Sequence, residues 1–154
     1  MKSNEIEIDF DNSIGPLLGK TVKILDFFVQ EYFNRATLDL TKEQMVVLKK
    51  LSFEDGLNQN ELAFLTLRNK SSLTRLLSKM ETKKYIKREQ DSIDKRIKRV
   101  FITEKGKEIF QKSRPAIKNI ITRIEQNISE EEKQEMIKTL KKIQSNFSSE
   151  TEPI

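Results

Sequence analysis

The sequence contains no cysteine, no histidine and no tryptophan, and it has only four glycines in 154 residues. Without thiols or imidazoles there is no thiol nucleophile or thiol switch, no His/Cys zinc site and no histidine base. No Gly-rich phosphate loop is present, and the Asp and Glu spacing matches no calcium loop. We therefore expect no catalytic residue, no metal and no cofactor, and hence no enzyme, although a metal site built from acidic residues alone stays open.

Long apolar runs are also absent. The stretch Met45–Leu48 is typical of the longest runs, and it is far too short to cross a bilayer. The acidic first eleven residues lack the basic-then-apolar order of a signal peptide. We expect a cytoplasmic protein without a membrane partner, folded as one domain of ordinary size.

Positive charge is concentrated in one part of the chain. Residues 66–107 carry fourteen Lys and Arg against five Asp and Glu, whereas the remainder carries fifteen against nineteen. The local balance is thus +9, against −4 elsewhere, within a net charge of +5. An evenly solvated lysine-rich surface would leave the chain ends equally basic, so the pattern indicates a polyanionic partner.

Apolar residues recur at helical spacing over most of the chain. They predict helices over residues 15–36, 41–55, 58–65, 70–82, 104–128 and 130–147, with fraying from Ser148 to Ile154. Thr41 with Gln44 and Ser129 with Glu132 form capping boxes that mark two of the helix starts. Pro115 predicts a kink inside the long helix.

Between residues 85 and 102 the apolar spacing changes from 3.6 to 2. Residues 85–90 and 96–102 alternate in polarity and predict two strands, joined by a loop over residues 91–95. The order is therefore a short capped helix, a turn, a polar-faced helix and a basic hairpin. A helix-turn-helix followed by such a hairpin is typical of winged-helix DNA-binding proteins.

The helix over residues 70–82 is the candidate DNA reader. Its small hydroxyl side chains can approach bases and phosphates closely, and Arg75 can bond to guanine bidentately. In the hairpin, Asp94 can pair with Arg96 and orient it toward a minor groove, while Lys95, Lys98 and Arg99 contact phosphates. The predicted DNA-binding residues are Asn69, Lys70, Ser71, Ser72, Thr74, Arg75, Ser78, Lys79, Asp94, Lys95, Arg96 and Lys98. The alternative of a merely solvated helix face and hairpin stays open.

We predict an α+β, mostly α, fold: a winged helix-turn-helix with long N- and C-terminal dimerisation helices. Residues 1–36 form an arm and the first dimerisation helix, 37–106 the DNA-binding region, and 107–154 the C-terminal dimerisation helices of one structural domain. A two-fold dimer would place two reading helices about one DNA turn apart. Alternatively, the terminal helices close the core of a monomer.

Three segments carry a family resemblance. Leu57–Ala63, Ser71–Leu77 and Asp94–Gly106 resemble the MarR (multiple antibiotic resistance regulator) family, and Asp-x-Arg followed by a strand ending in Thr-x-x-Gly is the most specific element. The resemblance covers nearly the whole chain. It implies a homodimeric bacterial transcription factor, usually a repressor, that binds a palindromic site. It also implies that residues 70–82 form the reading helix and that Arg96 is the wing arginine.

Two features depart from the family pattern. Many members have glycine where this chain has Lys84, so the turn there is strained if its φ is positive. Family members that sense oxidants or zinc through Cys or His are not matched. The remaining family mode is a small aromatic or anionic effector, for which the candidate pocket residues are Phe27, Phe28, Tyr32, Met45 and Leu48. The alternative that these five are plain core residues stays open.

We therefore expect a sequence-specific DNA-binding transcriptional regulator. It would occupy a palindromic operator as a homodimer, act as a repressor and be released by a small ligand, although activation and regulation without an effector stay open. The alternative is a winged-helix protein-interaction module whose basic face docks an acidic partner without sequence-specific DNA binding. Steep salt dependence of duplex binding distinguishes the two.

Overall fold

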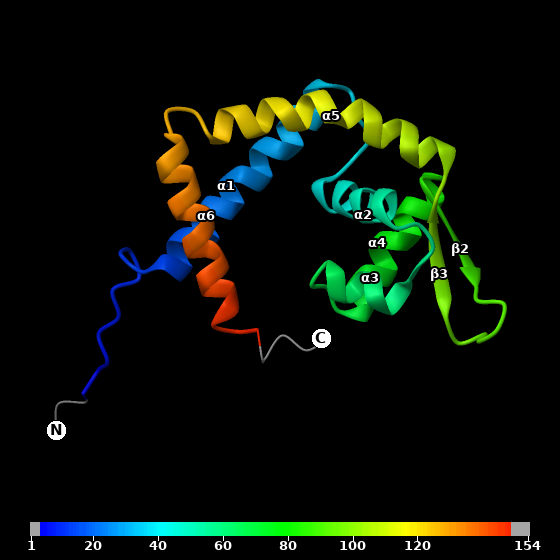
Figure 1. Ribbon diagram of the computed structural model, residues 1–154, viewed down its shortest axis with the longest axis horizontal. Helices are drawn as coiled ribbons and strands as arrows, with labels where there is room; N and C mark the ends of the chain where they lie inside the picture. The colour runs from blue at the N-terminus through cyan, green and yellow to red at the C-terminus, as the bar shows by residue number, and fades with distance from the viewer. Residues whose placement is uncertain (1–3, 149–154) are drawn as a thin grey trace.

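The computed structural model describes residues 4–148, which form a mostly helical fold with one small sheet (Figure 1). The elements in chain order are α1 (Ile14–Arg35), α2 (Lys42–Phe53), β1 (Leu57–Asn58), α3 (Gln59–Leu65), α4 (Lys70–Thr82), β2 (Ile86–Gln90), β3 (Lys98–Ile102), α5 (Glu104–Ile124) and α6 (Glu130–Ser145). This arrangement confirms the predicted α+β fold with terminal helices. The fraying predicted from Ser148 onward falls, beyond Ser148 itself, outside the described residues.

The sheet has three antiparallel strands in the order β1-β3-β2. The hairpin pairs Ile86 with Ile102 and Gln90 with Lys98, as the alternation predicted. The two-residue strand β1, in which Leu57 pairs with Val100, was not predicted. A strand that short has no alternation of its own to detect, and its pairing exists only because the chain returns beside β3.

The predicted start of the second hairpin strand was wrong, whereas the first strand ends at Gln90 as predicted. The second strand begins at Lys98 and not at Arg96, and the loop covers residues 91–97. Asp94 accounts for the difference, because its side chain accepts a hydrogen bond from the Arg96 N–H and its carbonyl oxygen accepts one from the Ile97 N–H. These local bonds hold the chain in a turn where alternation alone predicted extended backbone.

The core lies between α2, α3, α4 and the sheet. Leu48, Leu62, Leu73, Leu77 and Val100 come from four different elements, and all are fully buried. Helix α3 is only seven residues long, so its stability depends on this packing more than on its own hydrogen bonds. The core fixes the two helices of the helix-turn-helix against the hairpin.

The Thr-x-x-Gly motif joins the hairpin to α5. The Thr103 hydroxyl accepts a hydrogen bond from the Gly106 N–H (3.0 Å) and donates one to the carbonyl oxygen of Lys84 (2.6 Å). A Cβ on Gly106 would clash with the backbone carbonyl oxygen of Tyr85. The threonine therefore caps α5, and the glycine allows α5 to pass directly against the turn that follows α4.

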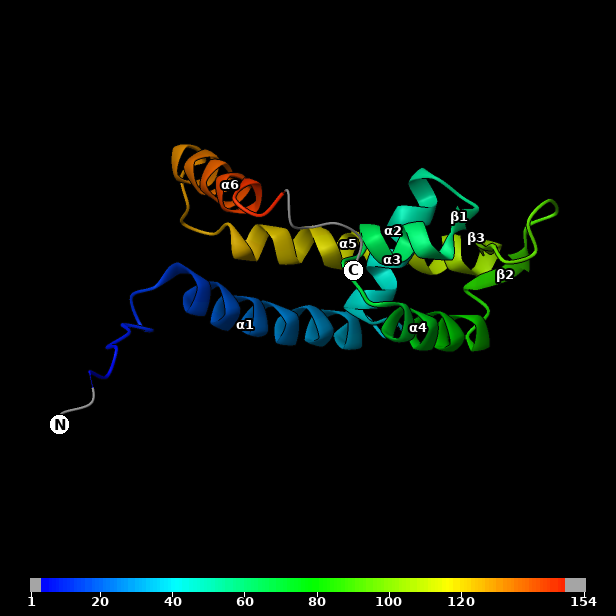
Figure 2. The same ribbon diagram turned by 90° about the horizontal axis from the view of Figure 1, so that it is seen from below.

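The terminal helices extend away from this core as an arch (Figure 1). Helix α5 continues through Pro115 and its ribbon bends near the middle, as expected of an internal proline. Helices α1 and α6 overlap in Figure 1, but the second view shows them on opposite sides of α5 (Figure 2). Helix α1 packs against α5, whereas α6 has no buried residue.

No helix within the described part of the chain combines the length and the apolar content that crossing a membrane requires.

Candidate nucleic-acid interface

The reading helix α4 begins and ends where the sequence predicted. The Asn69 side chain accepts a hydrogen bond from the Ser72 N–H (2.8 Å) and caps the helix. Leu73, Leu77 and Met80 are buried on one face. The other face carries the predicted polar residues; Ser72 is half-buried, and the exposed ones are Lys70, Ser71, Thr74, Arg75, Ser78 and Lys79.

Three hydroxyls on α4 are tied to the elements beside it. Gln59 Nε2 of α3 donates to Thr74 Oγ1 (3.1 Å), and Arg68 Nη1 of the α3–α4 turn donates to Ser72 Oγ (2.7 Å). Arg88 Nη2 of β2 donates to Ser78 Oγ (3.3 Å). These bonds fix the orientation of the reading helix from both sides. Within residues 4–148, the side chains of Arg75 and Lys79 have no hydrogen bond or ion pair and project from the helix.

Arg88 connects parts of the candidate interface, and the sequence reasoning missed it. Its Nε and Nη2 atoms bond to the two carboxylate oxygens of Glu81 at 3.2 and 3.1 Å, and its side chain is only 16% exposed. This hydrogen-bonded guanidinium lowers the pKa of Glu81. Arg88 shares one strand face with buried Ile86, and a charge at an inward strand position was the available signal. Arg88 joins the reading helix to the wing, which is β2, β3 and the loop 91–97.

The base of the wing is fixed by a second ion pair. Arg99 Nε donates to Asp91 Oδ1 (2.7 Å), and Arg99 Nη1 donates to the carbonyl oxygen of Gly56 (3.1 Å). The bond from Arg99 and the bonds from two backbone N–H groups lower the pKa of Asp91 to about 2. Arg99 was predicted to contact phosphate, but the structure engages its guanidinium within the protein, where it braces the wing.

Asp94 and Arg96 pair as predicted, although through a turn. Arg96 Nε and Nη2 lie 3.2 and 3.4 Å from the Asp94 carboxylate oxygens, and the Arg96 backbone N–H also donates to Asp94 Oδ1 (3.0 Å). The Arg96 side chain is 92% exposed. Lys95 and Lys98 are also exposed on this loop and the start of β3. The wing therefore presents an oriented guanidinium to solvent with two amino groups beside it.

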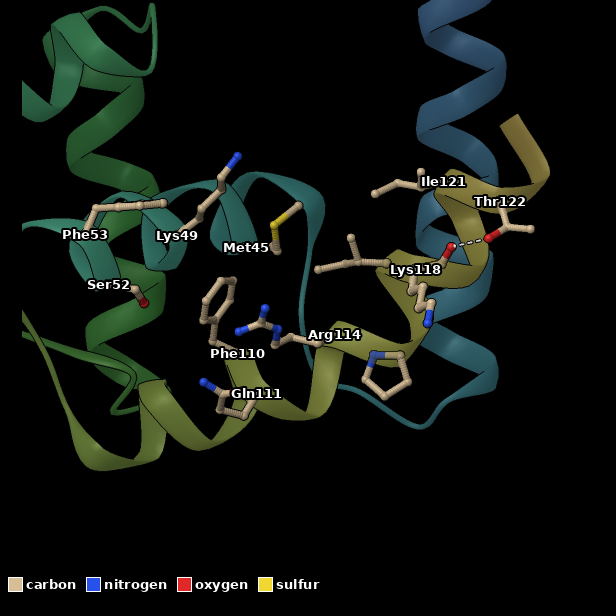
Figure 3. A pocket seen from close by; sticks show the side chains of 12 residues that line it. Met45, Lys49, Ser52, Phe53, Phe110, Gln111, Arg114, Lys118, Ile121 and Thr122 are labelled. Carbon is tan, nitrogen blue, oxygen red and sulfur yellow. Dashed lines mark hydrogen bonds between the residues drawn. The ribbon is translucent and has the colours of Figure 1, made fainter. Parts of the chain in front are cut away.

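A separate cavity of about 1120 Å³ lies between α2 and α5. Its lining is Met45, Lys49, Ser52, Phe53, Phe110, Gln111, Arg114, Pro115, Ile117, Lys118, Ile121 and Thr122. Figure 3 shows Met45, Phe110 and the Arg114 guanidinium directed into this space, whereas the amino groups of Lys49 and Lys118 point away. Apolar side chains therefore line part of the cavity, and one cation, the Arg114 guanidinium, points into it.

Of the five predicted pocket residues, the structure brings only Met45 to this cavity. Leu48 is fully buried in the core. Phe27 and Phe28 form an edge-to-face pair on α1 with ring centroids 5.3 Å apart, and the Arg123 guanidinium lies over the Phe28 ring. The Tyr32 hydroxyl accepts a hydrogen bond from Arg123 (3.5 Å). Phe28 and Tyr32 therefore contact Arg123 near the end of α5, away from the cavity.

Comparison with known proteins identifies the family of this chain. The model of the MarR family matches residues 40–98. The chain is 34% identical over 110 residues to the HTH-type transcriptional regulator SarZ of Staphylococcus aureus (strain USA300). The matched segment covers 71% of this chain and 73% of that protein.

Solved structures agree with this fold. A mutant MarR from E. coli, crystallised with operator DNA, superposes with a TM-score of 0.80 at 24% identity, covering 89% of this chain and 99% of that one. The PcaV regulator of Streptomyces coelicolor, crystallised with its natural ligand, gives a TM-score of 0.78 at 16% identity, covering 91% and 97%. The chain therefore belongs to the MarR family of transcriptional regulators, and it is a DNA-binding protein and not an enzyme.

Proposed function

We propose that the protein binds a palindromic DNA operator as a homodimer, represses transcription from it and leaves it when a small anionic ligand binds. The observation that carries the proposal is the placement of unpaired basic side chains beside an oriented wing arginine. Arg75 and Lys79 project from α4, and Arg96 projects from the wing. All three lie in the segment where positive charge is concentrated, which suits the polyanionic backbone of DNA.

Each predicted residue has a role that its position supports. Arg75, exposed at the middle of α4, suits bidentate bonding to a guanine edge in the major groove. Arg96, held by Asp94, suits the narrow minor groove beside it. The remaining residues of the set lie around these two and suit phosphate contacts, which position the protein on the duplex without reading sequence.

The homodimer is proposed from apolar side chains that one chain leaves uncovered. Large apolar residues are exposed on α1, on the far end of α5 and on α6; they include Leu17, Val22, Ile24, Phe27, Ile121, Ile124, Met136 and Ile137. Large apolar side chains exposed in such number on three helices favour an interface with another surface. A second copy related by a two-fold axis would cover the same helices on both chains and would pair two reading helices.

The ligand is proposed from the cavity between α2 and α5. An apolar floor with Met45 and Phe110 and an inward Arg114 suits a small aromatic carboxylate. The PcaV structure, which holds a natural ligand within the same fold, supports an effector for this chain. Filling this cavity would act on the joint between the dimer helix α5 and α2 of the helix-turn-helix, so it could change the spacing of the two reading helices.

The first test is selection from a random duplex DNA library. Recovery of an inverted repeat, with half-sites about ten base pairs apart, would support a dimeric operator-binding protein. Arg75→Ala should then weaken binding to the recovered site by about 1–3 kcal/mol and relax the preference at one base pair of each half-site. Equal weakening on operator and random duplex would make Arg75 a phosphate contact. Recovery of no motif, with little or no duplex binding, would instead favour an acidic protein partner.

A further inference from the structure

A polar recess of about 340 Å³ lies between the first turn of α2 and α4. We name it the α2–α4 recess, and Thr41, Glu43, Arg68, Ser72, Arg75 and Lys79 are among the residues that line it. Arg75 and Lys79 belong to the exposed polar face of the reading helix. The recess therefore opens beside the surface proposed to face DNA, but three of the six residues named, Thr41, Glu43 and Arg68, lie outside the predicted interface.

Arg68 is held in position by the protein. It follows Leu67, whose φ of +52° turns the chain between α3 and α4. Its backbone N–H donates to the carbonyl oxygen of Ala63 (2.9 Å), and its Nη1 donates to Ser72 Oγ (2.7 Å). A guanidinium has five N–H donors, and this single side-chain bond leaves most of them available. Arg68 is thus half-buried and oriented, yet mostly unsatisfied by the protein itself.

The charge around Arg68 is not neutralised. Arg68, Arg75 and Lys79 line the recess together with one carboxylate, that of Glu43. Within residues 4–148, no carboxylate lies within ion-pair distance of any of the three cations. By contrast, Arg88 and Arg99 of the same basic segment are each paired with an acidic side chain. The recess therefore gathers three cations against one carboxylate, and within residues 4–148 none of the three cations forms an ion pair.

We propose that a DNA backbone phosphate occupies the α2–α4 recess and that Arg68 is a further DNA-contacting residue. The proposal rests on the proposed function, because it needs DNA to lie along α4. A guanidinium fork bonds phosphate oxygens in parallel, and an oriented arginine loses little freedom on binding. The Thr41-capped N-terminal end of α2 borders the same space and adds a favourable dipole. The contact positions the duplex and reads no base.

The test is the salt dependence of duplex binding for Arg68→Gln, which removes the charge and leaves a shorter polar side chain. We expect weaker binding to the operator and to random duplex alike. The slope of log affinity against log salt should become shallower by about 0.9 for each recess that is filled. Arg68→Lys should restore much of the slope. Lys141→Gln on α6 removes the same charge far from the reading helix, and we expect it to keep the wild-type slope.

Glu43→Gln should change duplex affinity in the opposite direction to Arg68→Gln. Because it removes the one carboxylate that lines the α2–α4 recess among residues 4–148, it should strengthen binding to both duplexes. A series of duplexes with one neutral methylphosphonate linkage each then locates the phosphate. At one linkage per half-site, neutralisation should weaken the wild type and have no further effect on Arg68→Gln.

An unchanged slope for Arg68→Gln would overturn the proposal, as would loss of operator binding alone, which would indicate that Arg68 only orients α4 through Ser72. A wild-type protein that binds no duplex at all would defeat the proposed function itself. The two failures are thus distinguishable, since the first requires a wild type that binds DNA. Thermal unfolding of each variant at one protein concentration confirms that the comparison is between folded proteins.

Discussion

The winged-helix region and the terminal helices of this chain differ in how completely they bury their apolar side chains. Between Leu40 and Ile102 the apolar residues form one core shared by α2, α3, α4 and the sheet, and those left exposed are scattered. Helix α1 contributes only Phe33 to the buried residues, and α6 contributes none. The first region completes its core within one chain, whereas the second leaves whole helix faces uncovered.

This difference fits the two proposed roles, which are DNA contact for the winged-helix region and association with a second copy for the terminal helices. A self-sufficient core holds α4 and the wing in one geometry, and ion pairs at Arg88 and Arg99 fix that geometry further. The terminal helices have amphipathic faces that only another surface can bury. The proposed dimer would complete them, so that folding and association become linked for one half of the molecule and not for the other.

The largest expected effect comes from a charge placed on the uncovered face of α6. Met136 is 52% exposed in the single chain, so Met136→Glu should leave the fold intact. In the proposed dimer the change occurs twice, and each unpaired buried carboxylate should cost more than about 3 kcal/mol. Sedimentation should show monomer at micromolar concentration, with little operator binding. Gln134→Glu, on the polar side of α6, is the matched control; an undisturbed Met136→Glu dimer would place the interface elsewhere.

The next effect tests the joint between the two regions. Gly106→Ala adds a methyl group against the backbone carbonyl of Tyr85, and overpacking of this kind costs about 1–3 kcal/mol or more. The midpoint of urea unfolding should fall at constant protein concentration. Gly19 of α1 has open space around its Cβ position, so Gly19→Ala should instead stabilise by about 0.5–1 kcal/mol. Equal behaviour of the two variants would contradict this account of the joint.

The wing carries the third prediction. Arg96 is almost fully exposed and paired only with Asp94, so Arg96→Ala should leave stability unchanged and weaken binding to all duplexes roughly tenfold, or about 1.4 kcal/mol. Asp94→Asn, which loosens the guanidinium without removing it, should have a smaller effect. Fluorescence anisotropy at physiological salt measures both. Wild-type affinity for Arg96→Ala would remove the wing from the interface.

The smallest effect concerns the turn after α4. Lys84 has a φ of +63°, so the condition under which its replacement of the family's glycine strains the turn is met. Because glycine adopts this conformation without strain, Lys84→Gly should stabilise the protein by about 0.5–1 kcal/mol. Thermal unfolding measures the change. A destabilised Lys84→Gly variant would mean that the lysine side chain contributes contacts that outweigh the strain.

Individual elements show what could be predicted. The bounds of α4 were correct because a cap at Asn69 and a buried stripe agree on them. The pairing of Asp94 with Arg96 was also correct, although a turn and not a strand brings the two together. The wing loop was too short in the prediction because Asp94 accepts hydrogen bonds from the backbone N–H groups of Arg96 and Ile97. Four of the five pocket candidates were placed away from the cavity, which depends on how α2 faces α5.

By itself, the sequence determined the order of the helices and of the two hairpin strands, the segregation of basic charge and most of the residues proposed to contact DNA. These follow from periodicity, capping and composition, which are local properties of the chain. Only the tertiary structure decided which cations are neutralised and which remain free. Arg68, Arg88 and Arg99 all lie in the basic segment, and the sequence does not distinguish them. Within the described residues, Arg88 forms an ion pair with Glu81 and Arg99 with Asp91, whereas the Arg68 side chain bonds to the Ser72 hydroxyl. Such partners lie on different elements, and packing alone brings them within bonding distance.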